Sequence, residues 1–210
     1  NLLSTEVTNR IQAAKITWLR MGKLWSHKLP WRVVRMTAIG FMQNTLLSAM
    51  TAFCLTEAHC KRLTMALARQ LRFLMYKRQG TPEDGRKAGW REVFAFWQMA
   101  SCSTELRGRR LKLYQDWVSK PSAHVAELAA VFGTTKSDQK LGWHRLTTDG
   151  EVPATATPWG KQFWEDIVVL GQTEHGQQWF DDCNNAVCPL FHDAAVLVAF
   201  PCTAFTLLGA

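Results

Sequence analysis

Four residues near the C-terminal end of the chain are of the types that serve as zinc ligands in proteins. They are spaced as Cys183-x4-Cys188-x3-His192-x9-Cys202. A structural zinc site requires four ligands that converge tetrahedrally. The alternative is three buried cysteines and a surface histidine. None of the six cysteines forms a C-x-x-C pair, which favours this alternative. We therefore assign no metal and no cofactor, and keep these four residues as weak candidates.

Nucleophilic and acid–base chemistry has little support in the sequence. The six histidines are scattered along the chain, and the spacings support no Cys–His or Ser–His–Asp constellation. There is no glycine-rich phosphate loop, and we expect reduced, buried thiols. Trp143, Trp159 and Trp179 lie in less regular sequence and could stack on bases or contact a protein partner.

The clearest binding pattern lies in Glu57–Gly80, which we predict to be one helix ending before Gly80. Four leucines at positions 63, 67, 71 and 74 share one face at about 100° per residue. The opposite face carries Lys61, Arg62, Arg69 and Arg72, which we call the cationic ridge. Such a ridge could neutralise phosphates, or it could be the solvated basic face of an ordinary core helix.

The charge distribution favours a polyanion partner. The chain has 210 residues and a net charge of +8. Residues 1–120 hold 21 Lys/Arg and 7 Asp/Glu, whereas residues 121–210 hold 4 and 10. A basic half next to an acidic half is typical of nucleic-acid binding, although contact between the two halves is an alternative.

Apolar periodicity predicts an all-α fold, an irregular helical bundle with a loop-rich, mostly helical C-terminal part. The predicted helices cover residues 4–28, Trp31–Leu55, Glu57–Gln79, a stretch from Trp90, Leu106–Ser119, Pro121–Phe132 and a helix that opens at Thr157-Pro158. We expect Trp31–Leu55 to be the most buried of these. A second basic group, Arg107, Arg109, Arg110 and Lys112, begins the 106–119 helix, where positive charge opposes the helix dipole.

Two uncharged runs raise the question of a membrane. Thr37–Thr56 is long enough to span, but it contains Gln43, Asn44 and Ser48. Residues 194–210 are interrupted by Pro201. Membrane insertion is therefore the less favoured reading. No secretory n-region, h-region and cleavage site occur in order, which favours an intracellular protein.

The order of motifs resembles the region after the palm in reverse transcriptases of non-LTR, LINE-type retroelements. The first matching segments are Arg10-Ile11-Gln12-Ala13-Ala14, Trp18, Leu24-Trp25, Leu46-Leu47 and Ala52-Phe53-Cys54-Leu55-Thr56. They are followed by Leu63 through Arg69, Leu71 and Arg72, and by Glu105-Leu106-Arg107-Gly108-Arg109-Arg110-Leu111-Lys112. The similarity covers roughly residues 8–132 of the chain.

The resemblance implies a basic, thumb-like helical domain over residues 1–132. The composition predicts a loop or linker over residues 133–158. An acidic-to-apolar helical region is predicted over residues 159–210, to which the resemblance does not extend. Thumbs of this family grip template and primer through their backbones. The resemblance thus implies RNA or DNA backbone as the partner. It also implies that the cationic ridge and the second basic group contact phosphates.

The resemblance does not extend to catalysis. Polymerases of this family hold two metal ions with carboxylates of an aromatic-x-Asp-Asp hairpin in the palm. The nearest match here is Trp179-Phe180-Asp181-Asp182, which follows the thumb-like region, whereas the palm precedes it. We interpret it as an acidic surface turn, and we do not expect this chain alone to polymerise.

Two further hypotheses stay open at this point. The chain could be a structural accessory subunit, packed against protein subunits of a larger and possibly membrane-embedded assembly. The uncharged runs and the ten tryptophans favour that reading. It could also be a decayed copy of a retroelement.

Overall fold

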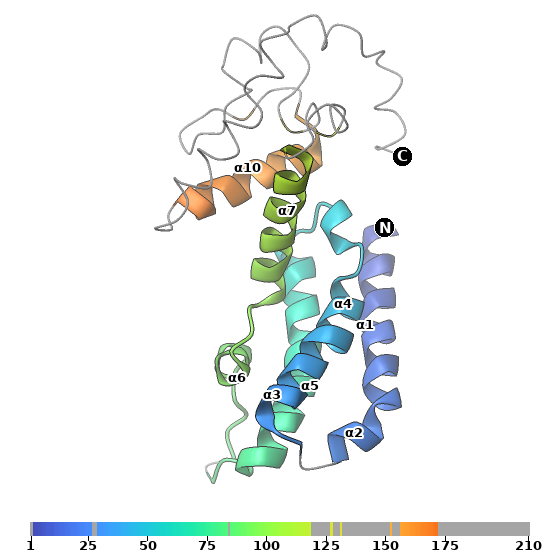
Figure 1. Ribbon diagram of the computed structural model, residues 1–210, viewed down its shortest axis with the longest axis vertical. Helices are drawn as coiled ribbons and strands as arrows, with labels where there is room; N and C mark the ends of the chain where they lie inside the picture. The colour runs from blue at the N-terminus through green and yellow to red at the C-terminus, as the bar shows by residue number, and fades with distance from the viewer. Residues whose placement is uncertain are drawn as a thin grey trace, which may run out of the picture. The chain divides into compact units, whose positions relative to one another are not determined.

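The described part of the chain is all-α, as the apolar periodicity predicts. The computed structural model describes residues 2–26, 29–83, 85–118, 127, 131, 152 and 156–171. These residues form helices joined by short connections, and no strand occurs among them (Figure 1). Most of the predicted 121–132 helix, and most of the C-terminal part expected to be rich in loops, lie outside the described ranges.

The predicted helix over residues 4–28 forms as two pieces, α1 (Leu2–Arg20) and α2 (Gly22–Ser26). Helical hydrogen bonding continues across Met21, whose amide donates to the Thr17 carbonyl. Trp18 and Trp25, which both belong to the predicted apolar stripe, stack with ring centroids 5.1 Å apart. The stripe therefore passes from one piece to the next.

The helix predicted over Trp31–Leu55 is shorter than expected. Helical backbone runs through α3 (Trp31–Thr37), the π-helix η1 (Ala38–Gln43) and α4 (Asn44–Leu47). It stops at Ser48, because Ala49 adopts a left-handed conformation with φ 59° before the short 3-10 turn η2 (Met50–Ala52). The break allows Met50 and Leu55 both to be buried.

The same segment is buried on one face only. Val34, Ala38, Met42, Leu46 and Leu47 are in the core. Met36 and Phe41 are 70% and 57% exposed. The segment is therefore amphipathic, because an uncharged sequence does not have to be buried on all sides.

Helix α5 (Glu57–Gln79) has the predicted bounds. Thr56 is its N-cap, and the Thr56 hydroxyl accepts from the His59 amide at 3.4 Å. Gly80 ends the helix at φ 83°, a conformation that side chains with a Cβ rarely adopt. The leucines at positions 63, 67, 71 and 74 are all buried, which confirms the predicted core face.

Helices α1 and α5 run parallel, with α3–α4 packed against both (Figure 1). Ser4 near the start of α1 contacts His59 near the start of α5, and Lys77 at the end of α5 donates to the Trp25 carbonyl in α2. The core of this bundle is a single cluster of apolar side chains that includes the α5 leucines. Sequence-distant α1 and α5 therefore share one surface.

Helix α6 (Trp90–Trp97) packs on α5. Trp97 is fully buried, and its indole Nε1 donates to the Leu71 carbonyl at 3.0 Å. Trp31 stacks on Trp97 with ring centroids 6.4 Å apart. Arg35 donates to the carbonyls of Trp97 and Gln98 at the end of α6. These contacts attach α6 to both α3 and α5.

Helix α7 (Cys102–Val118) begins four residues earlier than predicted. Its start is set by Ser101, whose hydroxyl accepts from the Thr104 amide. Helix α10 (Pro158–Gly171) follows later in the chain, with Phe163 and Ile167 fully buried. Tyr114 of α7 contacts Phe163 with ring centroids 4.6 Å apart.

The chain divides into two compact units, Asn1–Gly108 and Arg109–Ala210. The division falls inside α7, earlier than the boundary after residue 132 that the resemblance implies. Among the helices that the structure describes, none combines the length and the apolar character needed to cross a bilayer. This includes the uncharged run 37–56, whereas the run 194–210 lies outside the described residues.

Candidate nucleic-acid interface

The cationic ridge lies on the outer surface of α5, opposite its buried leucines. Lys61, Arg62 and Arg69 are exposed, and Arg72 is half-buried. Lys61 and Arg69 form no hydrogen bond or ion pair with any residue in the part of the chain that the structure describes. Their charges are therefore available to a partner.

Arg62 is held against α1. Its guanidinium donates to the Thr8 hydroxyl at 3.0 Å, and that hydroxyl donates to the Ser4 carbonyl at 2.9 Å. A single neutral acceptor leaves the positive charge of Arg62 uncompensated. The contact orients the side chain while it stays exposed to solvent.

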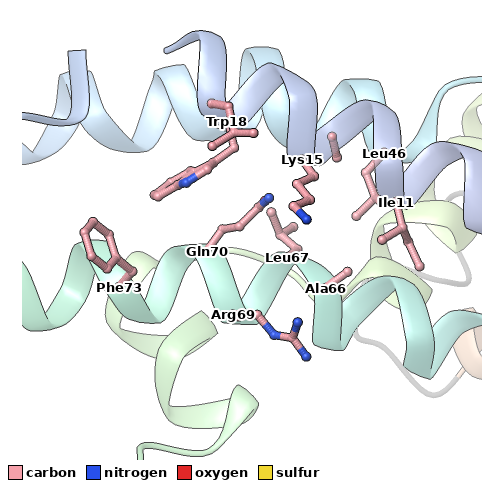
Figure 2. Close-up of a pocket in the computed structure, with 11 residues that line it drawn as sticks. Ile11, Lys15, Trp18, Leu46, Ala66, Leu67, Arg69, Gln70 and Phe73 are labelled. Carbon is pink, nitrogen blue, oxygen red and sulfur yellow. The ribbon is translucent and has the colours of Figure 1, made fainter. Parts of the chain in front are cut away.

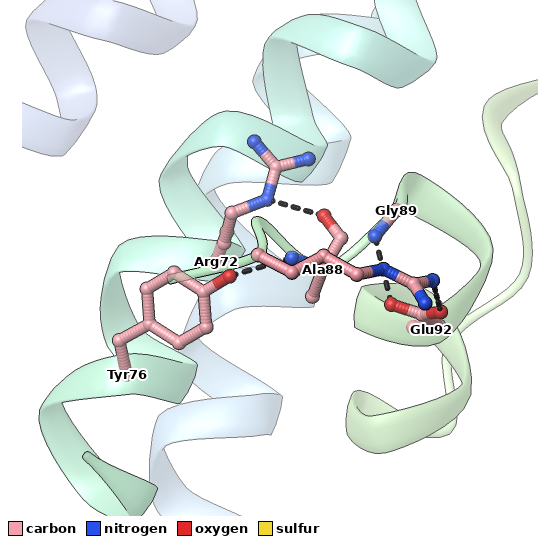
Figure 3. Close-up of polar contacts among 6 residues, drawn as sticks. Arg72, Tyr76, Ala88, Gly89 and Glu92 are labelled. Atoms are coloured by element: carbon pink, nitrogen blue, oxygen red, sulfur yellow. Dashed lines mark hydrogen bonds and ion pairs between the residues drawn. The ribbon is translucent and has the colours of Figure 1, made fainter. Parts of the chain in front are cut away.

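Arg72 has a structural contact on the other side of the ridge. Its Nε donates to the Ala88 carbonyl at 2.7 Å, and the Ala88 amide donates to the Tyr76 hydroxyl at 2.6 Å (Figure 3). The two terminal nitrogens of Arg72 point away from Ala88 in Figure 3. Arg72 thus fixes the segment before α6 and still presents part of its guanidinium outward.

Other basic residues of this unit bind backbone carbonyls. Lys77 donates to the Trp25 carbonyl in the last turn of α2 at 2.7 Å, and Arg78 donates to the Leu29 carbonyl, in the connection before α3, at 2.9 Å. Carbonyls in the last turn of a helix lack an intrahelical partner, and cationic donors there are favourable. Together with Arg35, these residues show that some of the positive charge in residues 1–120 stabilises the fold.

The second basic group differs from what its sequence suggests. Because α7 begins at Cys102 and has Glu105 in its first turn, Arg107 and Arg109 lie beyond the positive end of the helix dipole. Arg107 and Arg109 are half-buried, and only Lys112 is exposed. The expected conflict with the dipole therefore disappears.

Arg110 is an interior residue. Its Nε and one terminal nitrogen donate to the two carboxylate oxygens of Asp166, at 2.6 and 3.1 Å. The Arg110 and Asp166 side chains are only 6% and 3% exposed. The sequence placed Arg110 among the phosphate contacts, and this burial corrects that assignment. Its charge is already neutralised by Asp166.

A serine–histidine contact that sequence spacing did not reveal links α1 to α5. Ser4 Oγ lies 3.2 Å from His59 Nε2, and the Thr56 amide donates to His59 Nδ1 at 3.4 Å. In the tautomer in which Nδ1 accepts this bond, Nε2 carries the ring proton and donates to Ser4. A general base acting on the serine would need the opposite tautomer. The geometry instead makes His59 part of the α5 cap.

The metal candidates Cys183, Cys188, His192 and Cys202, and the Trp179–Asp182 turn, lie outside the described residues. Within the described ranges, no group of three or more His, Cys, Asp or Glu side chains is placed to hold a metal ion. Cys54, Cys60 and Cys102 form no disulfide bond. Trp159, one of the proposed stacking residues, packs against Phe163 with ring centroids 5.9 Å apart.

Comparison of the chain with protein-family models, with curated proteins and with solved structures finds no match.

Proposed function

We propose that this chain is a non-catalytic nucleic-acid-binding segment, similar to the thumb of a non-LTR reverse transcriptase, and that α5 contacts the backbone of template or primer. One observation carries the proposal. Lys61 and Arg69 are exposed on one helix face with no ionic partner among the described residues, and Arg62 is exposed beside them.

The surrounding sequence leaves this charge unscreened by acids. Glu57 is the only carboxylate between Glu6 and Glu83, whereas the same interval contains 13 Lys and Arg residues. Electrostatic steering and counterion release both favour a polyanion at such a surface. A carboxylate-rich ligand would also neutralise the ridge. The regularly spaced phosphates of a nucleic acid additionally match its length.

The spacing of the ridge suits a nucleic-acid backbone. Lys61 and Arg72 are 11 residues apart, so they lie about 16 Å apart along the axis of α5. Phosphates of one strand recur about every 3.4 Å along a duplex axis. The ridge can therefore follow roughly five successive phosphates. Backbone contacts of this kind bind without reading sequence.

The α7 residues contribute less to this proposal. Arg110 is excluded by its pairing with Asp166, and Arg107 and Arg109 are half-buried. Lys112 is the exposed member of that group. We therefore base the interface on Lys61, Arg62, Arg69 and the outward part of Arg72. Lys112 remains a phosphate contact proposed from sequence alone.

A second candidate function is that of an accessory subunit packed against other proteins. The exposed apolar side chains Met36, Phe41 and Phe73 favour it, since a protein partner would remove them from water. The two functions are compatible at Met36 and Phe41, which lie on α3 and η1, whereas Phe73 lies on α5 together with the ridge.

The proposal is tested by binding of the purified chain to a labelled primer–template duplex. We expect Lys61→Glu/Arg69→Glu to weaken binding about tenfold or more, because it removes two cations and adds two repulsive charges. The control Arg32→Glu/Lys87→Glu makes the same change in net charge at exposed residues without a hydrogen bond or ion pair in the described part. Equal weakening by both pairs would show only a net-charge effect and would contradict a specific interface.

A further inference from the structure

A half-open groove of about 350 Å³ lies between α1 and α5 (Figure 2). Its floor is formed by Leu46 and Leu67, both almost completely buried. Ala14 of α1 and Ala66 of α5 also line it, and their small side chains leave space between the two helices. The groove is therefore a consequence of where the chain places alanine.

The aromatic end of the groove is fixed. Trp18 stacks on Trp25 and meets the edge of Phe73 with ring centroids 5.8 Å apart. Ile11 lies toward the other end in Figure 2. The contacts between the rings therefore define the aromatic end of the groove.

The apolar surface extends beyond the hollow. Leu19 and Phe73, which line the groove, are 65% and 57% exposed. Ile16 of α1 and Met65 of α5 do not line the groove, although they are also exposed, at 49% and 42%. An apolar patch of this kind on two helices marks an interaction site rather than a pocket for a small molecule alone.

The rim of the groove is cationic. Lys15 and Arg69 are its charged members, and no carboxylate lines it among the residues that the structure describes. In Figure 2 the Lys15 amine and the Gln70 amide reach over the space between the helices, whereas the Arg69 guanidinium is directed outward from α5. Lys15 makes no hydrogen bond or ion pair within the described part of the chain. A ligand that is complementary to this groove has an apolar face for the hollow and anionic groups beside that face for Lys15 and Arg69.

We infer that the groove is the docking site of an acidic amphipathic helix supplied by a partner protein. Two parallel helices with a depression between them accept a third helix by ridges-into-grooves packing. Apolar residues of the incoming helix at i, i+3, i+4 and i+7 would cover Leu19, Phe73 and the alanine-lined hollow. Its acidic residues would pair with Lys15 and Arg69, as the charges across a complementary interface do.

The groove proposal does not require nucleic-acid binding, but it shares Arg69 with the cationic ridge, so the two proposals are separated through residues that belong to only one of them. Lys61 belongs to the ridge and does not line the groove, whereas Leu19 and Phe73 line the groove and carry no charge. Replacing one set or the other therefore separates the two activities.

The test uses a fluorescein-labelled synthetic peptide of roughly 18 residues, long enough to be helical, with leucine at helical spacing and glutamate on the remaining face. We expect saturable binding by fluorescence anisotropy. A peptide of the same composition with its leucines scrambled, and one with lysine in place of glutamate, are expected to bind at least about tenfold more weakly.

Variants of the chain locate the site. Leu19→Ala/Phe73→Ala and Lys15→Glu are expected to weaken peptide binding about tenfold or more, and both change exposed side chains that the fold does not require. Met36→Ala and Arg32→Glu, at exposed positions on α3, are the matched controls. Lys61→Glu should weaken duplex binding and leave peptide binding intact.

Three outcomes would overturn the inference. They are no binding of the acidic peptide to the folded chain, equal binding of the acidic and basic peptides, and equal effects of the groove variants and their α3 controls. A parent chain that binds the acidic peptide but not the duplex, or the duplex but not the peptide, would reject one proposal and leave the other standing.

Discussion

The guanidinium of Arg110 and the carboxylate of Asp166 form two hydrogen bonds, 2.6 and 3.1 Å long, across 56 residues of sequence. Both side chains are almost completely buried. The pair joins α7 to α10 within the second unit. The ion pair also removes Arg110 from the basic group of α7, because Asp166 neutralises its charge. The other members of that group are Arg107, Arg109 and Lys112.

We expect Arg110→Ala and Asp166→Ala each to lower the free energy of unfolding by about 3–5 kcal/mol, because each leaves a buried charge without its partner. The double replacement Arg110→Met/Asp166→Leu should recover most of that loss, since an apolar pair of similar volume can replace a buried ion pair. Urea unfolding followed by circular dichroism measures all three. Single replacements that cost under about 1 kcal/mol would mean that the pair is solvated.

Trp97→Phe is expected to cost about 1–3 kcal/mol, because it leaves the Leu71 carbonyl buried without its indole donor. Trp90→Phe is the control, since Trp90 is half-buried and makes no indole hydrogen bond in the described part of the chain. Chemical denaturation of the two variants gives the comparison. If both cost the same, ring volume rather than the hydrogen bond would account for the loss.

Thr56→Ala should destabilise the chain by about 1 kcal/mol, because the hydroxyl that caps α5 is lost. Thr56→Ser keeps the hydroxyl and should stay close to the parent. Thermal melting of the three proteins measures the difference. A serine variant as unstable as the alanine variant would argue against capping and for a role of the threonine methyl.

Within the ridge, Arg72 and Lys61 should respond differently to neutralisation. Arg72→Met removes the donor to the Ala88 carbonyl and should lower the free energy of unfolding by about 1 kcal/mol. The loss is smaller than for a fully buried hydrogen bond to a charged group, because Arg72 is half-buried. Lys61→Met should stay within about 0.5 kcal/mol of the parent. Equal stabilities in urea would show that Arg72 has no structural role.

The sequence predicts the helices well wherever the apolar stripe is regular. The α5 bounds follow from Thr56, the four leucines and Gly80, all of which act through local geometry. The stop after Leu47 was not predictable from periodicity, because it depends on how Met50 and Leu55 reach the core from distant elements. The early start of α7 follows from the Ser101 cap, which lies in the uncharged Ser-Cys-Ser-Thr stretch before Glu105, where apolar periodicity gives no signal.

The candidate site was predicted only in part. Helical spacing places Lys61, Arg62 and Arg69 on the outer face correctly, since that depends on α5 alone. It could not identify the partner of Arg110, because Asp166 is brought to it by tertiary packing. Lys15 was also missed as a neighbour of Arg69, because only the parallel arrangement of α1 and α5 brings the two to one groove.

The most direct test of the central claim is the salt dependence of duplex binding. The account predicts that log K falls linearly with log salt, and that Lys61→Glu/Arg69→Glu reduces the magnitude of the slope by about two, one for each phosphate that the variant no longer neutralises. The Arg32→Glu/Lys87→Glu control should keep the parent slope. A parent chain that is folded and does not bind at low salt, or a slope that stays the same without Lys61 and Arg69, would contradict the claim that α5 grips a nucleic-acid backbone.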